Sequence, residues 1–167
     1  MRVHNAHARH FAASADAVGR LVDGLSSADD RLWPRDHWPA MRFDRPLGVG
    51  AAGGHGPIRY TIESYVPGRL LRCRFTAPRG VRGTHQYEVE ALAGGGAVLR
   101  HEMTMDTAGP ALLTWPLMFR PLHDALIEDS LDRAAVALGE APVGAPWSPV
   151  VRLLRAAGRM VRARARR

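Results

Sequence analysis

The chain of 167 residues has no lysine, a single cysteine and no long apolar run. The lone Cys73 excludes an intramolecular disulfide and fits a reducing compartment. No stretch approaches the roughly 18 consecutive apolar residues that a membrane-spanning helix needs. Residues 1–10 carry two arginines and three histidines, and no apolar segment follows them, so they do not match a secretory signal peptide. We therefore expect a cytoplasmic protein.

The positive charge is confined to one end of the chain. All 23 basic residues are arginine, and seven of them follow Ser148, where there is no acid. The other 16 arginines are balanced by 16 acids, so the net charge of +7 belongs to the tail. The length suits one domain with an appendage. We expect a domain over residues 1–140, a proline-rich linker over 141–149 and a basic amphipathic helix over 150–167.

Apolar and polar residues alternate along several segments, which is the pattern of half-buried strands. Turn residues such as Gly94–Gly96 separate successive segments, so neighbouring strands should pair antiparallel. The glycine-rich residues 47–56 are expected to form a flexible connection or an irregular hairpin. The expected strands cover residues 3–11, 41–44, 58–63, 71–76, 84–92 and 97–107.

Apolar residues at helical spacing mark two helices. The first is predicted near residues 14–25, with Ser14 as its N-cap. A long helix should follow Pro121, which suits a first turn, and end at Gly139. The order of these elements predicts an α+β fold in which a curved antiparallel sheet wraps around the long C-terminal helix.

Three segments carry a resemblance to a known family: Phe11–Val18 at the first strand–helix junction, Ile58–Leu71, and Gly83–Val89. Together with the long final helix they resemble the START-like superfamily, also called SRPBCC, which includes polyketide cyclase/dehydratase and lipid-transport-like proteins. The resemblance covers about residues 1–140 and implies a helix-grip fold around an internal pocket. It does not name a function, since carriers, receptors and cyclases share this fold. Gly19 stands where many relatives have a large aromatic residue, so we expect looser packing there.

Strand alternation and helical spacing place a set of aromatic, histidine and methionine side chains towards one interior. Apolar walls with a few polar groups suit a small-molecule pocket. For any single member, simple packing in the core is the more common explanation. The predicted ligand-binding residues are Trp33, Trp38, Tyr60, His85, Tyr87, His101, Met103, Met105, Trp115, Phe119, His123 and Ile127.

The leading hypothesis is binding or carriage of a lipid, isoprenoid or polyketide-like molecule without a cofactor. The alternative is a cyclase, aromatase or dehydratase in which His85 or His101 acts as acid or base, with Tyr87 as hydrogen-bond donor. A zinc site on the interior histidines lacks any short ligand spacing, so no metal is expected. Cys73 falls on the apolar side of its strand, and no GxSxG or P-loop pattern occurs, so no catalytic nucleophile is predicted.

The tail has apolar residues on one helical face, including Val150, Leu153 and Met160, and arginines on the other. Docking of the apolar face on the domain or on a partner is the first expectation. Peripheral contact with an anionic membrane is the second. Nucleic acid ranks last because the body is neutral and the tail lacks aromatic residues. The arginines predicted to contact a membrane or partner are Arg152, Arg155, Arg159, Arg162 and Arg166.

Overall fold

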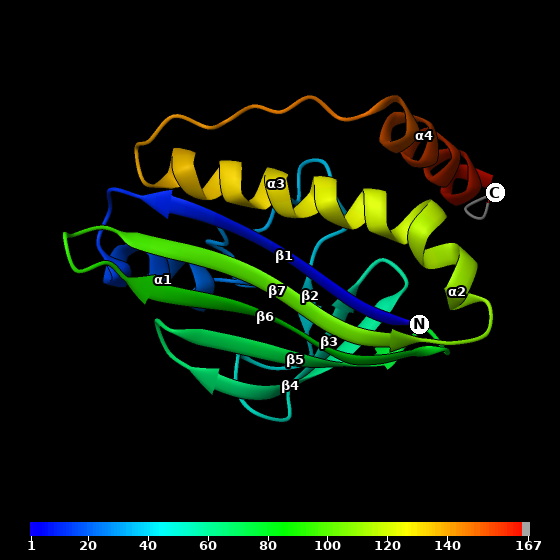
Figure 1. Ribbon diagram of the computed structural model, residues 1–167, viewed down its shortest axis with the longest axis horizontal. Helices are drawn as coiled ribbons and strands as arrows, with labels where there is room; N and C mark the ends of the chain where they lie inside the picture. The colour runs from blue at the N-terminus through cyan, green and yellow to red at the C-terminus, as the bar shows by residue number, and fades with distance from the viewer. Residues whose placement is uncertain (165–167) are drawn as a thin grey trace.

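The computed structural model describes residues 1–164, with side chains through Met160. Its centre is a curved sheet of seven antiparallel strands in the order β1-β7-β6-β5-β4-β3-β2 (Figure 1). The sheet is predominantly a meander because each strand from β2 to β7 pairs with the next one in the chain, and β1 closes the far edge against β7. The strands are β1 (Arg2–Phe11), β2 (Arg42–Phe43), β3 (Ala52–His55), β4 (Ile58–Val66), β5 (Leu70–Ala77), β6 (Val81–Ala91) and β7 (Ala97–Thr107).

The predicted alternation is confirmed on the long strands. On β7, Leu99, His101, Met103 and Met105 are buried, whereas the intervening side chains are more exposed. The register of β6 and β7 sets His85 opposite Met103 and Tyr87 opposite His101. Because these pairs lie on one face, the apolar side of the sheet carries the histidines into the interior.

The first helix, α1 (Ala15–Asp23), begins where the sequence predicts it. The Ser14 hydroxyl accepts a hydrogen bond from the Ala17 backbone amide at 3.3 Å. The expectation of looser packing at Gly19 is wrong: a Cβ placed there would lie 2.4 Å from the carbonyl oxygen of Gly68. Gly19 is therefore where α1 approaches the β4–β5 turn most closely, and a side chain has no room.

The glycine-rich segment is an ordered part of the sheet. Residues Ala52–His55 form β3, which pairs with β2 on one side and β4 on the other. Gly54 has φ of 156°, and a Cβ there would lie 2.0 Å from the Ile58 carbonyl oxygen. Of the two predicted alternatives, the irregular hairpin is confirmed and the flexible connection is wrong, because glycine permits backbone approaches that other residues do not.

One long helical stretch covers the concave face of the sheet (Figure 1). It runs through α2 (Ala111–Thr114), η1 (Trp115–Phe119) and α3 (Arg120–Ala137). Pro116 lies at the start of the widened π-turn η1, where the Arg120 amide donates to the Trp115 carbonyl five residues back. The predicted long helix is confirmed, and it begins earlier than Pro121.

Residues 141–148 form neither helix nor strand and run back along α3 to the last helix, α4 (Pro149–Arg164) (Figure 1). The Asp132 carboxylate on α3 accepts hydrogen bonds from the backbone amides of Val143 at 2.9 Å and Gly144 at 3.0 Å. In the part of the chain that the structure describes, no helix has the length and apolarity to cross a membrane.

The tail docks on the domain with only part of the apolar face predicted from the sequence, since Leu154 and Ala157 line the cavity described below. Val151 is buried, whereas Val150, Leu153 and Met160 point to solvent. The arginine-rich side of α4 partly faces the domain, since Arg155 packs against two tryptophans. The side chain of Arg162 and the whole of Arg166 lie outside the described residues.

Candidate ligand-binding cavity

A cavity of about 930 Å³ lies between the concave face of the sheet and the helical cover. Its walls come from the ends of β5 to β7, from η1 and from the first half of α3. The predicted residues that line it are Trp33, Trp38, His85, Tyr87, His101, Met103, Met105, Trp115, Phe119, His123 and Ile127. An apolar wall of this size with few polar groups is the usual form of a small-molecule site.

Three histidines meet in this cavity, as the sequence predicts. The ring centroids of His85 and His101 are 5.7 Å apart, and those of His101 and His123 are 5.1 Å apart. The three side chains come from β6, β7 and α3. Strand pairing and helix packing together bring residues distant in sequence to one wall.

Several polar atoms of this wall have no hydrogen-bond partner. They are His85 Nε2, His101 Nδ1 and His123 Nδ1, and all three atoms are fully buried. An unpaired buried polar atom costs roughly 1–3 kcal/mol, so native proteins seldom leave one without a ligand or ordered water. Three such atoms around one cavity indicate that a molecule bound there carries polar groups.

Burial keeps the interior histidines neutral. It lowers the pKa of His85 to about 3 and that of His101 well below its ordinary value, because a charged ring would lose its hydration. Burial also lowers the pKa of His123, with the contacts to Asp124 opposing that effect. The premise of the acid–base hypothesis, a ring pKa near neutrality, therefore does not hold for His85 or His101.

Tyr87 is held in place by a buried hydrogen-bond chain. Its hydroxyl lies 3.0 Å from Ser130 Oγ, which in turn donates to the Leu32 carbonyl at 3.1 Å. Burial raises the pKa of Tyr87, so the hydroxyl keeps its proton. Burial also raises the pKa of the Cys73 thiol to about 12, which agrees with its prediction as an inert core residue.

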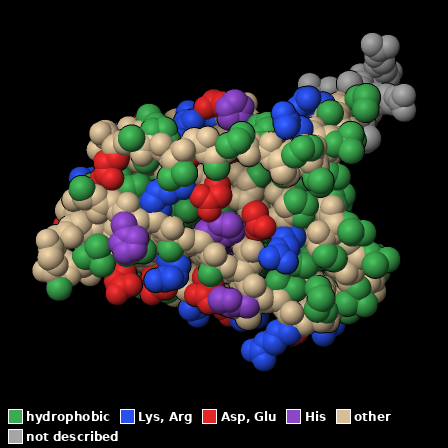
Figure 2. Space-filling view, turned by 45° about the horizontal axis from the view of Figure 1, so that its top comes forward, with side chains coloured by type: hydrophobic (Ala, Val, Ile, Leu, Met, Phe, Trp, Pro, Cys, Tyr) green, Lys and Arg blue, Asp and Glu red, His purple; other side chains and the backbone are tan. Residues whose placement is uncertain are grey.

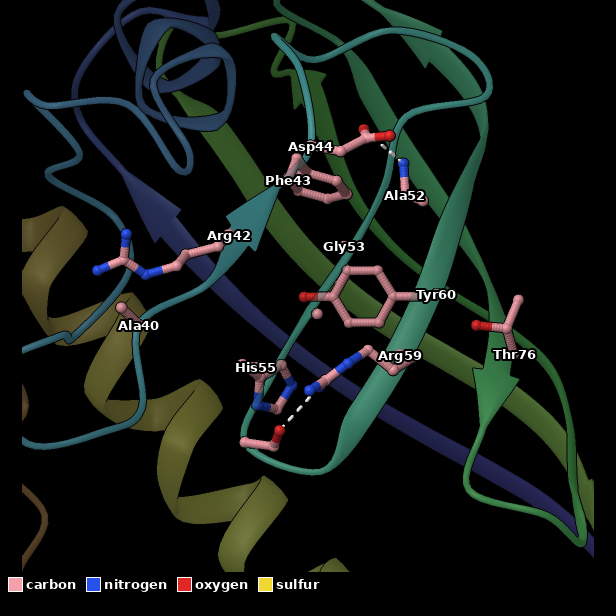
Figure 3. A pocket seen from close by; sticks show the side chains of 12 residues that line it. Ala40, Arg42, Phe43, Asp44, Ala52, Gly53, His55, Arg59, Tyr60 and Thr76 are labelled. Carbon is pink, nitrogen blue, oxygen red and sulfur yellow. Dashed lines mark hydrogen bonds between the residues drawn. The ribbon is translucent and has the colours of Figure 1, made fainter. Parts of the chain in front are cut away.

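Tyr60 does not line the large cavity. It borders a neighbouring hollow of about 640 Å³ along β3 and β4, where Phe43, His55 and Arg59 surround it (Figure 3). His55 lies in the wall of both spaces. Burial lowers its pKa to about 3. Sequence analysis missed His55 because a segment read as a loose connection gave no reason to place its side chain.

The tail closes one side of the cavity mouth. The guanidinium carbon of Arg155 lies 4.2 Å from the ring centroids of both Trp38 and Trp147. Both indole nitrogens donate to the Asp129 carboxylate, at 2.6 Å from Trp38 and 3.0 Å from Trp147. Cation–π contact with two rings fixes α4 at this place. Arg159 of the same helix also lines the cavity, so the basic tail is part of the pocket wall.

Sequence analysis also missed a polar ladder between β1 and α3. Asn5, His7 and Arg9 alternate along β1 and contact carboxylates spaced four residues apart on α3. Two residues of strand span about 6.7 Å and four residues of helix about 6 Å, so the two spacings match. The rungs are Asn5–Asp124, His7–Asp124, His7–Glu128, Arg9–Glu128 and Arg9–Asp132.

No protein-family model and no curated protein matches the chain. Solved structures do. The di-domain ARO/CYC StfQ from the steffimycin biosynthetic pathway gives a TM-score of 0.61 at 14% identity, covering 83% of this chain and 51% of StfQ. Ara h 8.0201 gives 0.59 at 12% identity, covering 84% of this chain and 100% of the other. Norcoclaurine synthase from Thalictrum flavum gives 0.58 at 15% identity, covering 78% and 84%.

These similarities define the class of fold. The chain has the helix-grip fold of START-like (SRPBCC) proteins, which confirms both the resemblance and the predicted α+β architecture. The chain spans about half the length of StfQ. Identities of this size show the fold alone, so function has to be argued from the cavity.

Proposed function

We propose that the protein binds an apolar small molecule in the cavity between the sheet and α3. The observation that carries this proposal is a space of about 930 Å³ with a mainly apolar wall into which unpaired histidine nitrogens are set. The proteins of similar fold include a cyclase of a biosynthetic pathway and a synthase, which supports a small organic molecule as occupant.

The wall also indicates the chemistry of that molecule. His85 and His101 are neutral, so each can donate one hydrogen bond and accept another. Neither supplies a positive charge that would pair with an acidic ligand. Met103, Met105 and Trp115 supply adaptable apolar surface. The ligand we propose is therefore an uncharged ring system or chain that carries hydroxyl or carbonyl groups, as lipids, isoprenoids and polyketide-like compounds do.

A screen of such compounds by thermal shift and native mass spectrometry tests the proposal. We expect one ligand per chain and a rise in melting temperature. The same hits measured with His85→Phe should bind less tightly when they carry oxygen groups and about equally when they do not. The proposal would be refuted if no compound of this class binds, or if the compounds bind equally well to a variant whose cavity is filled.

Cyclisation or dehydration of a bound substrate is the enzymatic alternative. The histidines with lowered pKa offer weak support for proton transfer, although they could still orient a reactive carbonyl. Replacing His85 and His101 in turn separates the two functions: loss of turnover with retained binding indicates catalysis, and loss of both indicates a binding role.

We also propose peripheral contact with an anionic membrane at the cavity rim. Exposed leucines lie on α2, η1 and α4, three elements that border the cavity: Leu113 and Leu117 are 69% exposed and Leu153 is 71% exposed. Figure 2 shows apolar side chains at this end of the molecule, next to arginines. The arginines Arg152 and Arg159 of α4 are exposed there too. Leucines flanked by arginines suit a bilayer surface with acidic lipids.

Sedimentation with liposomes tests this contact. We expect binding to vesicles with acidic lipid that weakens at high salt, and little binding to zwitterionic vesicles. Leu117→Ser and Leu153→Ser should each reduce it, whereas Val143→Ser in the linker should not. Deleting residues 148–167 without any effect on sedimentation would remove the tail from this role.

A further inference from the structure

The rung of the β1–α3 ladder at His7 brings two imidazoles and a carboxylate together. We propose that His7, His123 and Asp124 form a binding site for a divalent transition-metal ion, with Zn²⁺ as the ion that fits best. This site lies in the wall beside the cavity, and the proposal does not depend on what the cavity binds.

Geometry is the first support. In residues 1–160, the potential ligand atoms of His7, His123 and Asp124 all lie within 4.8 Å of one another. His7 Nε2 is 3.2 Å and His123 Nδ1 is 3.7 Å from Asp124 Oδ1. Ligand atoms on a tetrahedral zinc ion, with bonds of about 2.0–2.2 Å, lie roughly 3.3 Å apart. The His7–Asp124 distance already matches this spacing, and the other ligand-atom distances would have to shorten by at most about 1.5 Å to coordinate the ion.

The second support is an unsatisfied nitrogen. His123 Nδ1 is buried and has no hydrogen-bond partner, since 3.7 Å to Asp124 is too long for one. The ladder joins Asn5, His7 and Arg9 to the carboxylates of α3, so it gives no role to His123. A cation bound beside Asp124 would satisfy this nitrogen.

The third support is the surrounding shell. The second nitrogen of His7, Nδ1, lies 2.7 Å from Glu128 Oε1. Arg9 holds the other oxygen of Glu128 at 2.8 Å, and Asn5 donates to Asp124 Oδ1 at 2.8 Å. A histidine ligand commonly donates its other N–H to a carboxylate, which fixes the ring and strengthens the metal bond. The arrangement Glu128–His7–metal reproduces this pattern.

Donor type and access favour Zn²⁺. Two imidazole nitrogens with one carboxylate suit zinc, and three protein ligands leave a position for water. The side chains of His7, His123 and Asp124 are 14%, 16% and 36% exposed, so an ion can reach them from solvent. His85 and His101 do not form such a group with His123 in the described residues.

Metal binding to the full chain tests the proposal directly. Purified protein stripped with a chelator is titrated with Zn²⁺ by calorimetry, and with Co²⁺ to follow visible absorption. We expect one ion per chain. His7→Ala and Asp124→Asn should each weaken binding about 100-fold or more, and His10→Ala, on the outer face of β1, should leave it unchanged. Unfolding curves of each metal-free variant establish that it is folded.

Glu128→Gln provides a test that leaves all three ligands in place. The glutamine keeps an acceptor for the His7 N–H but removes the negative charge behind the ring. The imidazole then becomes a weaker ligand, and we expect Zn²⁺ binding to weaken by about 10-fold or more. Absence of stoichiometric binding in the unmodified chain would overturn the proposal. Equal binding by His7→Ala, Asp124→Asn and the unmodified chain would also overturn it, by assigning the ion to other surface histidines.

Discussion

At the scale of single residues, the interior is distinguished by polar groups placed among apolar ones. Some are fully satisfied, such as Tyr87 through Ser130 and the Leu32 carbonyl. Others, such as His85 and His101, present unpaired nitrogens. The satisfied groups fix the wall, and the unpaired groups remain for a ligand.

Ser130→Ala should destabilise the protein by about 1–3 kcal/mol, because it leaves the Tyr87 hydroxyl and the Leu32 carbonyl buried without their partner. Urea unfolding measures the change. Ser27→Ala, at an exposed position, is the matched control and should change the free energy of unfolding by less than about 0.5 kcal/mol. Equal effects of the two substitutions would show that the buried chain does not stabilise the wall.

Acid should destabilise the fold through its interior histidines. Burial holds the pKa of His55 and His85 at about 3, below their unfolded value of 6.5. Between these values the unfolded chain takes up protons that the folded chain does not. The contribution of these rings to the free energy of unfolding is therefore full above pH 6.5. It falls as the pH decreases, by up to about 1.4 kcal/mol per pH unit for each ring.

The rings that face His85 are Tyr60, Phe75 and His101, and Arg59 adds positive charge near His55. Urea unfolding between pH 7 and pH 5 measures the dependence. His85→Asn should make it shallower, and His10→Asn at the surface is the control. A free energy of unfolding that stays constant over this range would contradict the burial of neutral histidines.

At the scale of elements, the long strands and the covering helix follow directly from periodicity. The β7 alternation predicts which residues face inward, and Pro116 marks where the regular helix is interrupted. The β3 hairpin and the ladder were not predictable in the same way. The first depends on glycines that permit close backbone approach, and the second on two distant segments whose spacings happen to match.

The orientation of α4 shows another limit of a sequence pattern. Of its predicted apolar face, Leu154 and Ala157 line the cavity, but Val150, Leu153 and Met160 are exposed. The contact also uses Val151, and Arg155 against two tryptophans. Two neighbouring aromatic rings bind the Arg155 guanidinium through cation–π contacts, and this contact positions the helix. Only the fold reveals that Trp38 and Trp147 lie next to each other.

Gly19→Ala should be strongly unfavourable, because its Cβ would meet the Gly68 backbone. Relief of this clash requires α1 to move away from the β4–β5 turn, and overpacking of this kind costs about 1–3 kcal/mol. Gly94→Ala, where nothing lies within 4 Å, is the control. Thermal and urea unfolding compare the two, and a neutral Gly19→Ala would contradict the close contact.

Arg155→Gln should loosen α4 from the domain without unfolding it. We expect faster amide hydrogen exchange across residues 149–160 and little change in the sheet. Arg152→Gln, at an exposed position on the same helix, should leave exchange unaltered. Identical exchange in both variants would show that the contact with Trp38 and Trp147 does not hold the helix.

At the scale of the molecule, a neutral helix-grip domain and a basic tail combine into one cavity. The tail supplies Leu154, Arg155 and Arg159 to the cavity wall. Leu153 on α4 and Leu117 on η1 are exposed, and Figure 2 shows apolar side chains next to arginines at this end of the molecule. With the membrane contact that we propose, such a rim would let an apolar ligand pass between a membrane and the interior with little exposure to water.

Occupancy of the cavity is the measurement that tests this account most directly. Binding of a fluorescent apolar probe is compared between the unmodified chain and Met103→Trp, which places an indole in the cavity. Val143→Trp, at an exposed linker position outside the cavity lining, is the control. The account predicts one probe per chain, lost in Met103→Trp and kept in Val143→Trp. Equal binding by all three, or none by the unmodified chain, would contradict a ligand-binding cavity.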